Sequence, residues 1–358
     1  MHKNANLYVT LSTIVWMART ASIHTDYLCR EQESNAGVHW YLIYKMAKQP
    51  VDFDQSGIFA NGHGFFYMTS ATAVTGWTRS KLGIDMTEQL LERTLRPYYE
   101  KPEDRDALRI MYTSRTSGRN SYGLLMSKEE NAYWLLHGAN AFPPKRSYAW
   151  PQGEATDKAH LLFCASFDPS SLQQIARTLR YERPRVYLHY LPRRYQISPY
   201  VELIDQVESR KQMPTRVQLL HTKRLKSGKV EEIIYIVKHK QAALDLFLDV
   251  IAPFTGTAYD SWTKSTTKNN CSERRYGVKN ILSGLHLAHG GDMTTLYRNS
   301  DDSRWLMSAN KERPVWCYTT SDRTEQDSSL GGSAICIENG PLHKAFLAME
   351  VTAQVDSC

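Results

Sequence analysis

The sequence predicts a mixed fold of the α/β class (α+β in detail), built as one large domain. Strand-like runs rich in β-branched and aromatic residues alternate with amphipathic helical patterns in both halves of the chain, which disfavours an all-β architecture. The 358 residues are 42% apolar and 23% charged, a composition that supports a substantial core and is unlike that of disordered chains. No short-period repeat or low-complexity linker divides the chain.

The first half predicts several strands and one amphipathic helix. Residues 85–98 carry an N-cap candidate at Asp85, Glu88 three residues later and Pro97 as a stop signal, so we expect a helix there. Aromatic and β-branched density predicts the strands. These strands are expected at residues 38–46, 62–68, 107–112, 123–126 and 132–136.

A similar series follows in the second half. Strands are expected at residues 160–167 and 185–191, helices at 169–179 and 241–251, and a hairpin of residues 216–224 and 229–237 around Ser227-Gly228. The polar, proline-containing stretch 192–213 is the expected join between halves. The domain therefore runs over residues 22–358, with a first half of about 29–200 and a second half of about 201–358.

The N-terminus resembles a secretory signal peptide. Residues 7–18 form a short apolar run that is too short to span a bilayer, and small residues follow it. We expect cleavage near residue 21 and a secreted, extracellular protein without membrane insertion. A buried N-terminal strand or helix is the alternative explanation of the same run.

The six cysteines point to disulfides rather than to a metal site. No two of them form a C-x-x-C pair, so a zinc ribbon or a thioredoxin motif has no support, and no metal or cofactor is expected. An even number of cysteines after a signal peptide favours three disulfides, with 15 connectivities open. Asn270 begins a glycosylation sequon whose middle residue is Cys271.

Several segments together resemble the deoxyribonuclease II family. No single segment is specific to the family. Their order and spacing are specific, and they extend over nearly the whole chain after Cys29. The segments that carry the resemblance are residues 37–45 (GVHWYLIYK), 133–144 (YWLLHGANAFPP), 148–151 (YAWP), 161–167, 302–305 (DSRW), 315–317 (VWC), 331–336 (GGSAIC) and 344–346.

The resemblance implies the fold, the disulfide scheme and a glycan. The family fold is phospholipase-D-like, with two pseudo-symmetric halves of sheet and helix that share a central cleft. The family pattern pairs the cysteines as Cys29–Cys164, Cys271–Cys358 and Cys317–Cys336, and Asn270 falls where the family is often glycosylated.

The family cuts phosphodiesters without metal by means of two His-x-Lys motifs. One imidazole attacks phosphorus, the second protonates the leaving oxygen, and the lysines stabilise the charge that develops. At the first motif this chain has Asn120 and Tyr122, which supply neither a nucleophilic imidazole nor a positive charge.

The second motif is also replaced. Asp302 and Arg304 stand where the family has His and Lys. Arg304 keeps the charge, but a carboxylate about 4 Å from a phosphate oxygen repels it by roughly 4 kcal/mol at an effective dielectric of 20. Both motifs are therefore degenerate, and we expect an inactive homologue.

Two rescues of catalysis stay open. Asp302 could act as a nucleophile, or the retained His137 could supply an imidazole, which would make the protein an acid endonuclease with a rewired site. The literal His-x-Lys at His221–Lys223 lies on the expected hairpin, away from the family site, and is a chance match.

The hairpin and the segment around Cys271 are rich in cations. Either these are solvated surfaces, or they form a platform for DNA, a sulfated glycan or an acidic protein. The candidate binding residues are Lys223, Arg224, Lys226, Lys229, Arg274 and Arg275. We therefore expect a secreted glycoprotein that acts by binding an extracellular-matrix, cell-surface or polyanionic ligand, with DNA among the candidates. The oligomeric state is not predicted.

Overall fold

The computed structural model describes residues 27–50, 56–100, 104–114, 120–207, 214–226, 228–266, 276–282, 284–289, 292–350 and 355. The expected signal peptide lies outside these described residues, and so do Asn270, Cys271, Arg274, Arg275 and Cys358.

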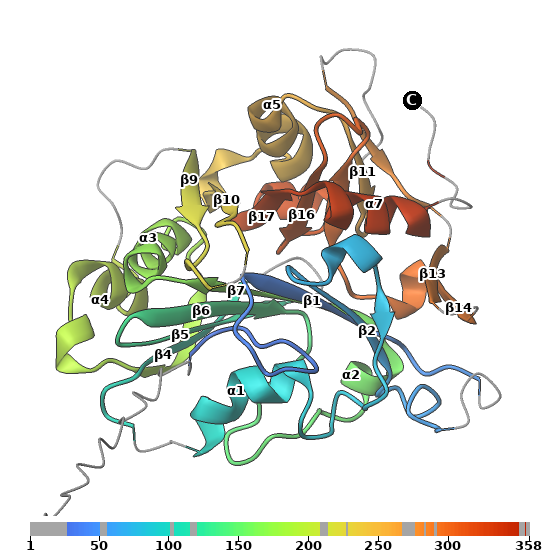
Figure 1. Ribbon diagram of the computed structural model, residues 1–358. Coiled ribbons are helices and arrows are strands. Elements are labelled where there is room, and N and C mark those ends of the chain that lie inside the picture. The colour runs from blue at the N-terminus through green and yellow to red at the C-terminus, as the bar shows by residue number, and fades with distance from the viewer. Residues whose placement is uncertain are drawn as a thin grey trace, which may run out of the picture.

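Two large sheets form the frame of the described part of the chain (Figure 1). The first sheet has the order β3-β2-β1-β7-β6-β5-β4-β8 and every neighbouring pair in it is antiparallel. Its strands are β1 (Trp40–Lys45), β2 (Phe65–Thr69), β3 (Thr78–Arg79), β4 (Leu108–Ser114), β5 (Ser121–Lys128), β6 (Asn131–His137), β7 (His160–Phe167) and β8 (Arg185–Tyr190).

The second sheet has the order β12-β11-β15-β16-β17-β10-β9. Only its β11–β12 pair is parallel among the described pairings. Its strands are β9 (Thr215–His221), β10 (Glu232–Lys238), β11 (Tyr259–Trp262), β12 (Val278–Asn280), β15 (Trp305–Ser308), β16 (Val315–Thr319) and β17 (Gly332–Glu338). A small separate pair consists of β13 (Leu285–His289) and β14 (Asp292–Leu296).

Helices lie between and outside the two sheets. The helices α3 (Pro169–Leu179), α4 (Ser198–Ile204) and α7 (Gly340–Met349) contribute to the large core cluster that also takes in buried residues of both sheets. The helix α1 (Leu90–Glu100) covers the outer face of the first sheet, below it in Figure 1. The π-helix η5 (Leu246–Ile251) and α5 (Ala252–Thr255) cover the outer face of the second sheet.

The helix α3 illustrates how the sequence forms these layers. Asp168 stands at its N-cap position and Pro169 at its first turn, where a proline costs no hydrogen bond. Leu172, Ile175 and Leu179 then recur at helical spacing and are buried. The expected mixed α/β architecture, with a sheet and helices in each half, is confirmed.

Two expected helices have different bounds in the structure. The first helix begins at Leu90 because Glu88 adopts a positive φ of 63°, and Asp85 contacts His63 (3.3 Å) instead of capping the helix. Pro97 lies inside α1, close to its end, and so does not terminate it as predicted. In the segment 241–251, Ala243 has a φ of 48°, which breaks the helix, and Asp245 caps a new one through the backbone N–H groups of Phe247 and Leu248.

The expected join also contains unpredicted structure. Residues 192–213 include the short η3 (Arg193–Tyr195) and α4, whose Tyr200 and Leu203 are buried in the core between the sheets. The remaining short elements are η2 (Ala73–Thr75), α2 (Glu154–Asp157), η4 (Lys240–Ala242), η6 (Arg298–Ser300) and α6 (Glu325–Ser328).

Two disulfides connect described residues. Cys29 and Cys164 tie the segment before β1 to β7, and Cys317 and Cys336 join β16 to β17. Both pairings agree with the expected scheme, and the Cys271–Cys358 pairing lies outside the described residues.

Candidate functional site

The two motif segments meet where the first half contacts the second. Asn120 is exposed immediately before β5, and Tyr122 lies in β5 opposite His137 of β6. The Arg304 guanidinium crosses to the first half, where its Nη1 donates to Ser121 Oγ at 2.8 Å. Ser121 stands between Asn120 and Tyr122, so the four predicted motif positions are brought together in one region.

The ring of Tyr122 covers His137. The two rings are stacked, with centroids 5.4 Å apart and an angle of 12° between their planes. The Tyr122 hydroxyl donates to Asn140 Oδ1 at 2.8 Å, which holds the ring in place. His137 is 1% exposed, and this burial lowers its pKa to about 3. Its imidazole is therefore neutral even at the pH of an acidic compartment.

Arg304 is part of a buried ion pair. Its Nε lies 3.2 Å from Asp322 Oδ2, and both side chains are 2% exposed. Besides the bond to Ser121, its Nη1 contacts the Thr320 carbonyl at 3.4 Å. Asp322 also accepts a hydrogen bond from the backbone N–H of Lys264 (2.9 Å). The guanidinium thus links the two sheets and is turned inward.

Asp302 lies beside basic residues that follow α2. Its backbone N–H donates to the Ala159 carbonyl (2.9 Å), and its carboxylate lies 3.6 Å from Lys158 Nζ. His160, at the start of β7, is 2% exposed, and burial is the main cause that lowers its pKa to about 3. The charge of Lys45 lowers this pKa further, whereas Asp302 opposes the shift.

Two buried residues that the sequence interpretation missed support this region. Lys45 Nζ donates to the carbonyls of Ala155, Thr156 (2.9 Å) and Lys158 (2.7 Å), and burial lowers its pKa to about 7. It thereby fixes the backbone that carries Lys158. One feature of the sequence could have indicated this role: Lys45 ends the apolar strand-like run 40–45. Positions in such a run are usually buried, and a buried lysine needs polar partners.

The second missed residue is Asp301, which is 0% exposed. Its Oδ2 accepts hydrogen bonds from the Tyr44 hydroxyl (2.6 Å) and from Trp262 Nε1 (2.7 Å), and its Oδ1 accepts one from the Ser303 backbone N–H (2.8 Å). These bonds join both halves of the chain and hold the segment with Asp302 and Arg304 in one conformation.

A pocket of about 380 Å³ opens beside Tyr122. We call it the aromatic pocket. Its lining contains four aromatic side chains, one amide and one cation, and its other lining residues are apolar. These six residues are Tyr98, Tyr122, Phe142, Tyr187, Asn140 and Lys145.

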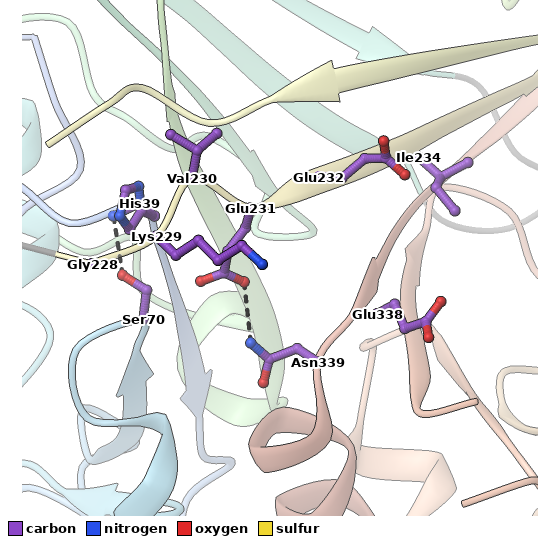
Figure 2. Close-up of a pocket in the computed structure, with 10 residues that line it drawn as sticks. All are labelled: His39, Ser70, Gly228, Lys229, Val230, Glu231, Glu232, Ile234, Glu338 and Asn339. Carbon is purple, nitrogen blue, oxygen red and sulfur yellow. Dashed lines mark hydrogen bonds between the residues drawn. The ribbon is translucent and has the colours of Figure 1, made fainter. Parts of the chain in front are cut away.

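The expected cationic hairpin is formed by β9 and β10, but it is not a uniformly basic surface. Lys223 Nζ pairs with Asp168 Oδ1 (2.7 Å), and its side chain is 15% exposed. Lys229 lines a second pocket, of about 410 Å³, together with Glu231, Glu232 and Glu338 (Figure 2). Lys223 therefore has an acidic partner, and Lys229 shares its pocket with three glutamates, which the sequence alone did not reveal.

This second pocket lies at the other end of β1 from the motif region. His39 precedes β1 and Ser70 follows β2, and the Ser70 hydroxyl accepts the His39 backbone N–H at 3.0 Å (Figure 2). Glu231 Oε2 accepts hydrogen bonds from Trp40 Nε1 (2.8 Å) and Asn339 Nδ2 (3.1 Å). Glu231 thus joins the two halves, a structural role.

The described residues contain no group of three or more His, Cys, Asp or Glu side chains placed to hold a metal ion. They also contain no helix that is long and apolar enough to cross a membrane.

Comparison with known proteins gives one consistent result. The profile of the family "Deoxyribonuclease II" matches residues 28–358. Cell-death-related nuclease 7 of Caenorhabditis elegans is 22% identical, over 90% of this chain and 85% of its own length. Deoxyribonuclease-2-alpha of Sus scrofa is 26% identical, over 88% and 86%. Plancitoxin-1 of Acanthaster planci is 23% identical, over 98% and 97%.

Proposed function

The chain belongs to the deoxyribonuclease II family, and on this premise we propose that it is a secreted member that no longer cleaves DNA and acts by binding a polyanionic ligand. Matrix and cell-surface molecules of that chemistry are candidate ligands, as is DNA. Secretion is supported by the two disulfides, which are typical of oxidising compartments. The expected signal peptide is consistent with it.

The chemistry of the four motif positions supports the loss of cleavage. Metal-free phosphodiester cleavage in this family requires two imidazoles and two cations around one phosphate. Asn120 and Tyr122 supply neither group, and Asp302 adds negative charge where a phosphate would bind. Arg304 keeps its charge, but that charge is compensated by buried Asp322.

The observation that carries the proposal is the state of the two histidines near these positions. His137 and His160 are both buried, with the pKa of each lowered to about 3. A general acid must be protonated at the working pH, and neither imidazole is protonated at pH about 5. The ring that covers His137 is that of Tyr122, the residue that the resemblance assigns to the position of the family lysine.

Plasmid nicking without metal tests the proposal. We expect the secreted protein to leave supercoiled plasmid intact in EDTA from pH about 4 to 7.5, beside an active family member as the positive control. A second preparation carries Asn120→His, Tyr122→Lys, Asp302→His and Arg304→Lys, which restores both motifs. Nicking by the unaltered protein would overturn the proposal, and nicking by the restored protein alone would support it strongly.

The alternative function is an acid endonuclease with a rewired site. One observation favours it: Asp302 lies 3.6 Å from Lys158 Nζ and close enough to His160 to oppose the lowering of its pKa. If Asp302 is the nucleophile, Asp302→Asn abolishes nicking and the Asp157→Asn control, at an exposed carboxylate near by, retains it.

A further inference from the structure

The aromatic pocket is held in shape by contacts that need no ligand. Tyr122 is fixed by its stacking on His137 and by its hydrogen bond to Asn140. Phe142 packs edge-to-face against His137, with ring centroids 5.3 Å apart, and in a tilted arrangement against Trp150, with ring centroids 4.9 Å apart. Side chains that are already ordered lose little entropy when a ligand binds, so these rings suit a binding surface.

Tyr187 supplies the exposed wall. The register between β4 and β8 shifts at this point, since Met111 pairs with Leu188 and Tyr112 with Val186, which leaves Tyr187 as the extra residue of a bulge. Bulges re-aim side chains and are frequent beside functional sites. Tyr187 is 44% exposed, a large aromatic surface in contact with water at the mouth of a pocket.

The polar groups of the pocket match one kind of ligand. Asn140 Oδ1 accepts both the Tyr122 hydroxyl and the Ala141 backbone N–H (2.9 Å), so the amide presents its Nδ2 donors for further contacts. Lys145 is the charged residue of the lining, Arg146 next to it is exposed, and no described lining residue is acidic. Aromatic faces, amide donors and cations without carboxylates suit a planar ring that carries a phosphate.

On the basis of the proposed binding function, we propose that the aromatic pocket holds one unstacked base of a single-stranded nucleic acid. The base stacks against Tyr187 and Tyr122, acceptor atoms on its edge take hydrogen bonds from Asn140 Nδ2, and Lys145 and Arg146 contact the flanking phosphates. The volume of about 380 Å³ lies in the range of sites for small ligands. In this assignment Tyr122, which the resemblance places at the position of the family lysine, stacks on a base.

Fluorescence anisotropy with short oligonucleotides tests the proposal. The probes are a labelled oligothymidylate, an abasic phosphodiester oligomer of the same length, and a blunt duplex, all in EDTA and about 50 mM salt. We expect the oligothymidylate to bind about tenfold more tightly than the abasic oligomer, because stacking is available only to the former. Tyr187→Ala removes about tenfold of this affinity and leaves abasic binding unchanged.

Tyr190→Ala is the matched control, since Tyr190 is a 40% exposed tyrosine of the same strand that does not line the pocket. Its oligothymidylate affinity should stay within twofold of the unaltered protein. The pocket assignment is overturned if the two oligomers bind with equal affinity, or if both variants lose the same affinity for the oligothymidylate. It is also overturned if the protein binds choline or an uncharged oligosaccharide in a Tyr187-dependent way in place of the oligothymidylate. Cleavage of the probe, monitored on a gel, contradicts the proposed loss of catalysis and leaves the pocket assignment standing.

Discussion

At the residue scale, Arg304 illustrates how a charged side chain at a predicted motif position can have a structural role. Its guanidinium donates a hydrogen bond to Ser121 of the first half and forms an ion pair with Asp322 of the second half. The side chains of Arg304 and Asp322 are each 2% exposed. A buried ion pair gains little over apolar packing of the same shape, but it is costly to break, because one charge is then left buried and unpaired.

We therefore expect Asp322→Asn to lower the free energy of unfolding by about 3–5 kcal/mol. Urea denaturation measures it. The matched control is Asp157→Asn, which breaks an ion pair with Lys48 whose side chains are 54% and 56% exposed, and which should cost less than about 1 kcal/mol. Equal losses in the two variants would contradict a structural role for the Arg304–Asp322 pair.

At the element scale, the two described disulfides constrain the chain very differently. Cys29 and Cys164 are 135 residues apart, whereas Cys317 and Cys336 are 19 apart and lie opposite each other in β16 and β17. Loop-closure entropy predicts a loss of about 5 kcal/mol for Cys29→Ala/Cys164→Ala and about 3 kcal/mol for Cys317→Ala/Cys336→Ala. Denaturation of the two double variants without reductant compares them, and the reverse order would count against the entropic explanation.

Elements with complete local signals were predictable, and those shaped by single backbone angles were not. The strand 160–167 and the helix 169–179 have the predicted bounds, because an apolar run, a cap position and a first-turn proline all agree there. The late start of α1 and the break before η5 depend on positive φ values at Glu88 and Ala243, residues with no special preference for that region.

The sequence predicted only those site residues that the family resemblance points to. The resemblance located Asn120, Tyr122, Asp302 and Arg304, and the structure brings these together. The partners that decide their chemistry come from distant segments: Asp322 pairs with Arg304, and Lys158 lies near Asp302. Such pairings follow from the sheet topology, so neither spacing nor residue type could reveal them.

At the scale of the whole molecule, burial of His137 and His160 makes the stability sensitive to acid. The folded-state pKa of each is about 3, below the ordinary value of about 6.5. The unfolded chain therefore binds protons that the folded chain excludes. The stabilisation due to each histidine is complete above pH about 6.5 and is lost as the pH falls towards 3, by about 2 kcal/mol at pH 5.

The loss of stability due to His137 can be separated from the effects of other titrating groups by comparing variants. Glu350, whose pKa burial raises to about 8, acts in the opposite direction, so the total change with pH is not diagnostic. His137→Phe keeps a ring under Tyr122 and removes the titration, and it should reduce the loss of unfolding free energy between pH 7.5 and 5 by about 2 kcal/mol. His221→Phe, at an exposed position of β9, should leave that loss as it is in the unaltered protein. Urea titrations at the two pH values measure the loss of unfolding free energy in each variant. If that loss is the same in His137→Phe and His221→Phe, His137 is protonated in the folded protein at pH 5. The main argument against His137 as a general acid then fails.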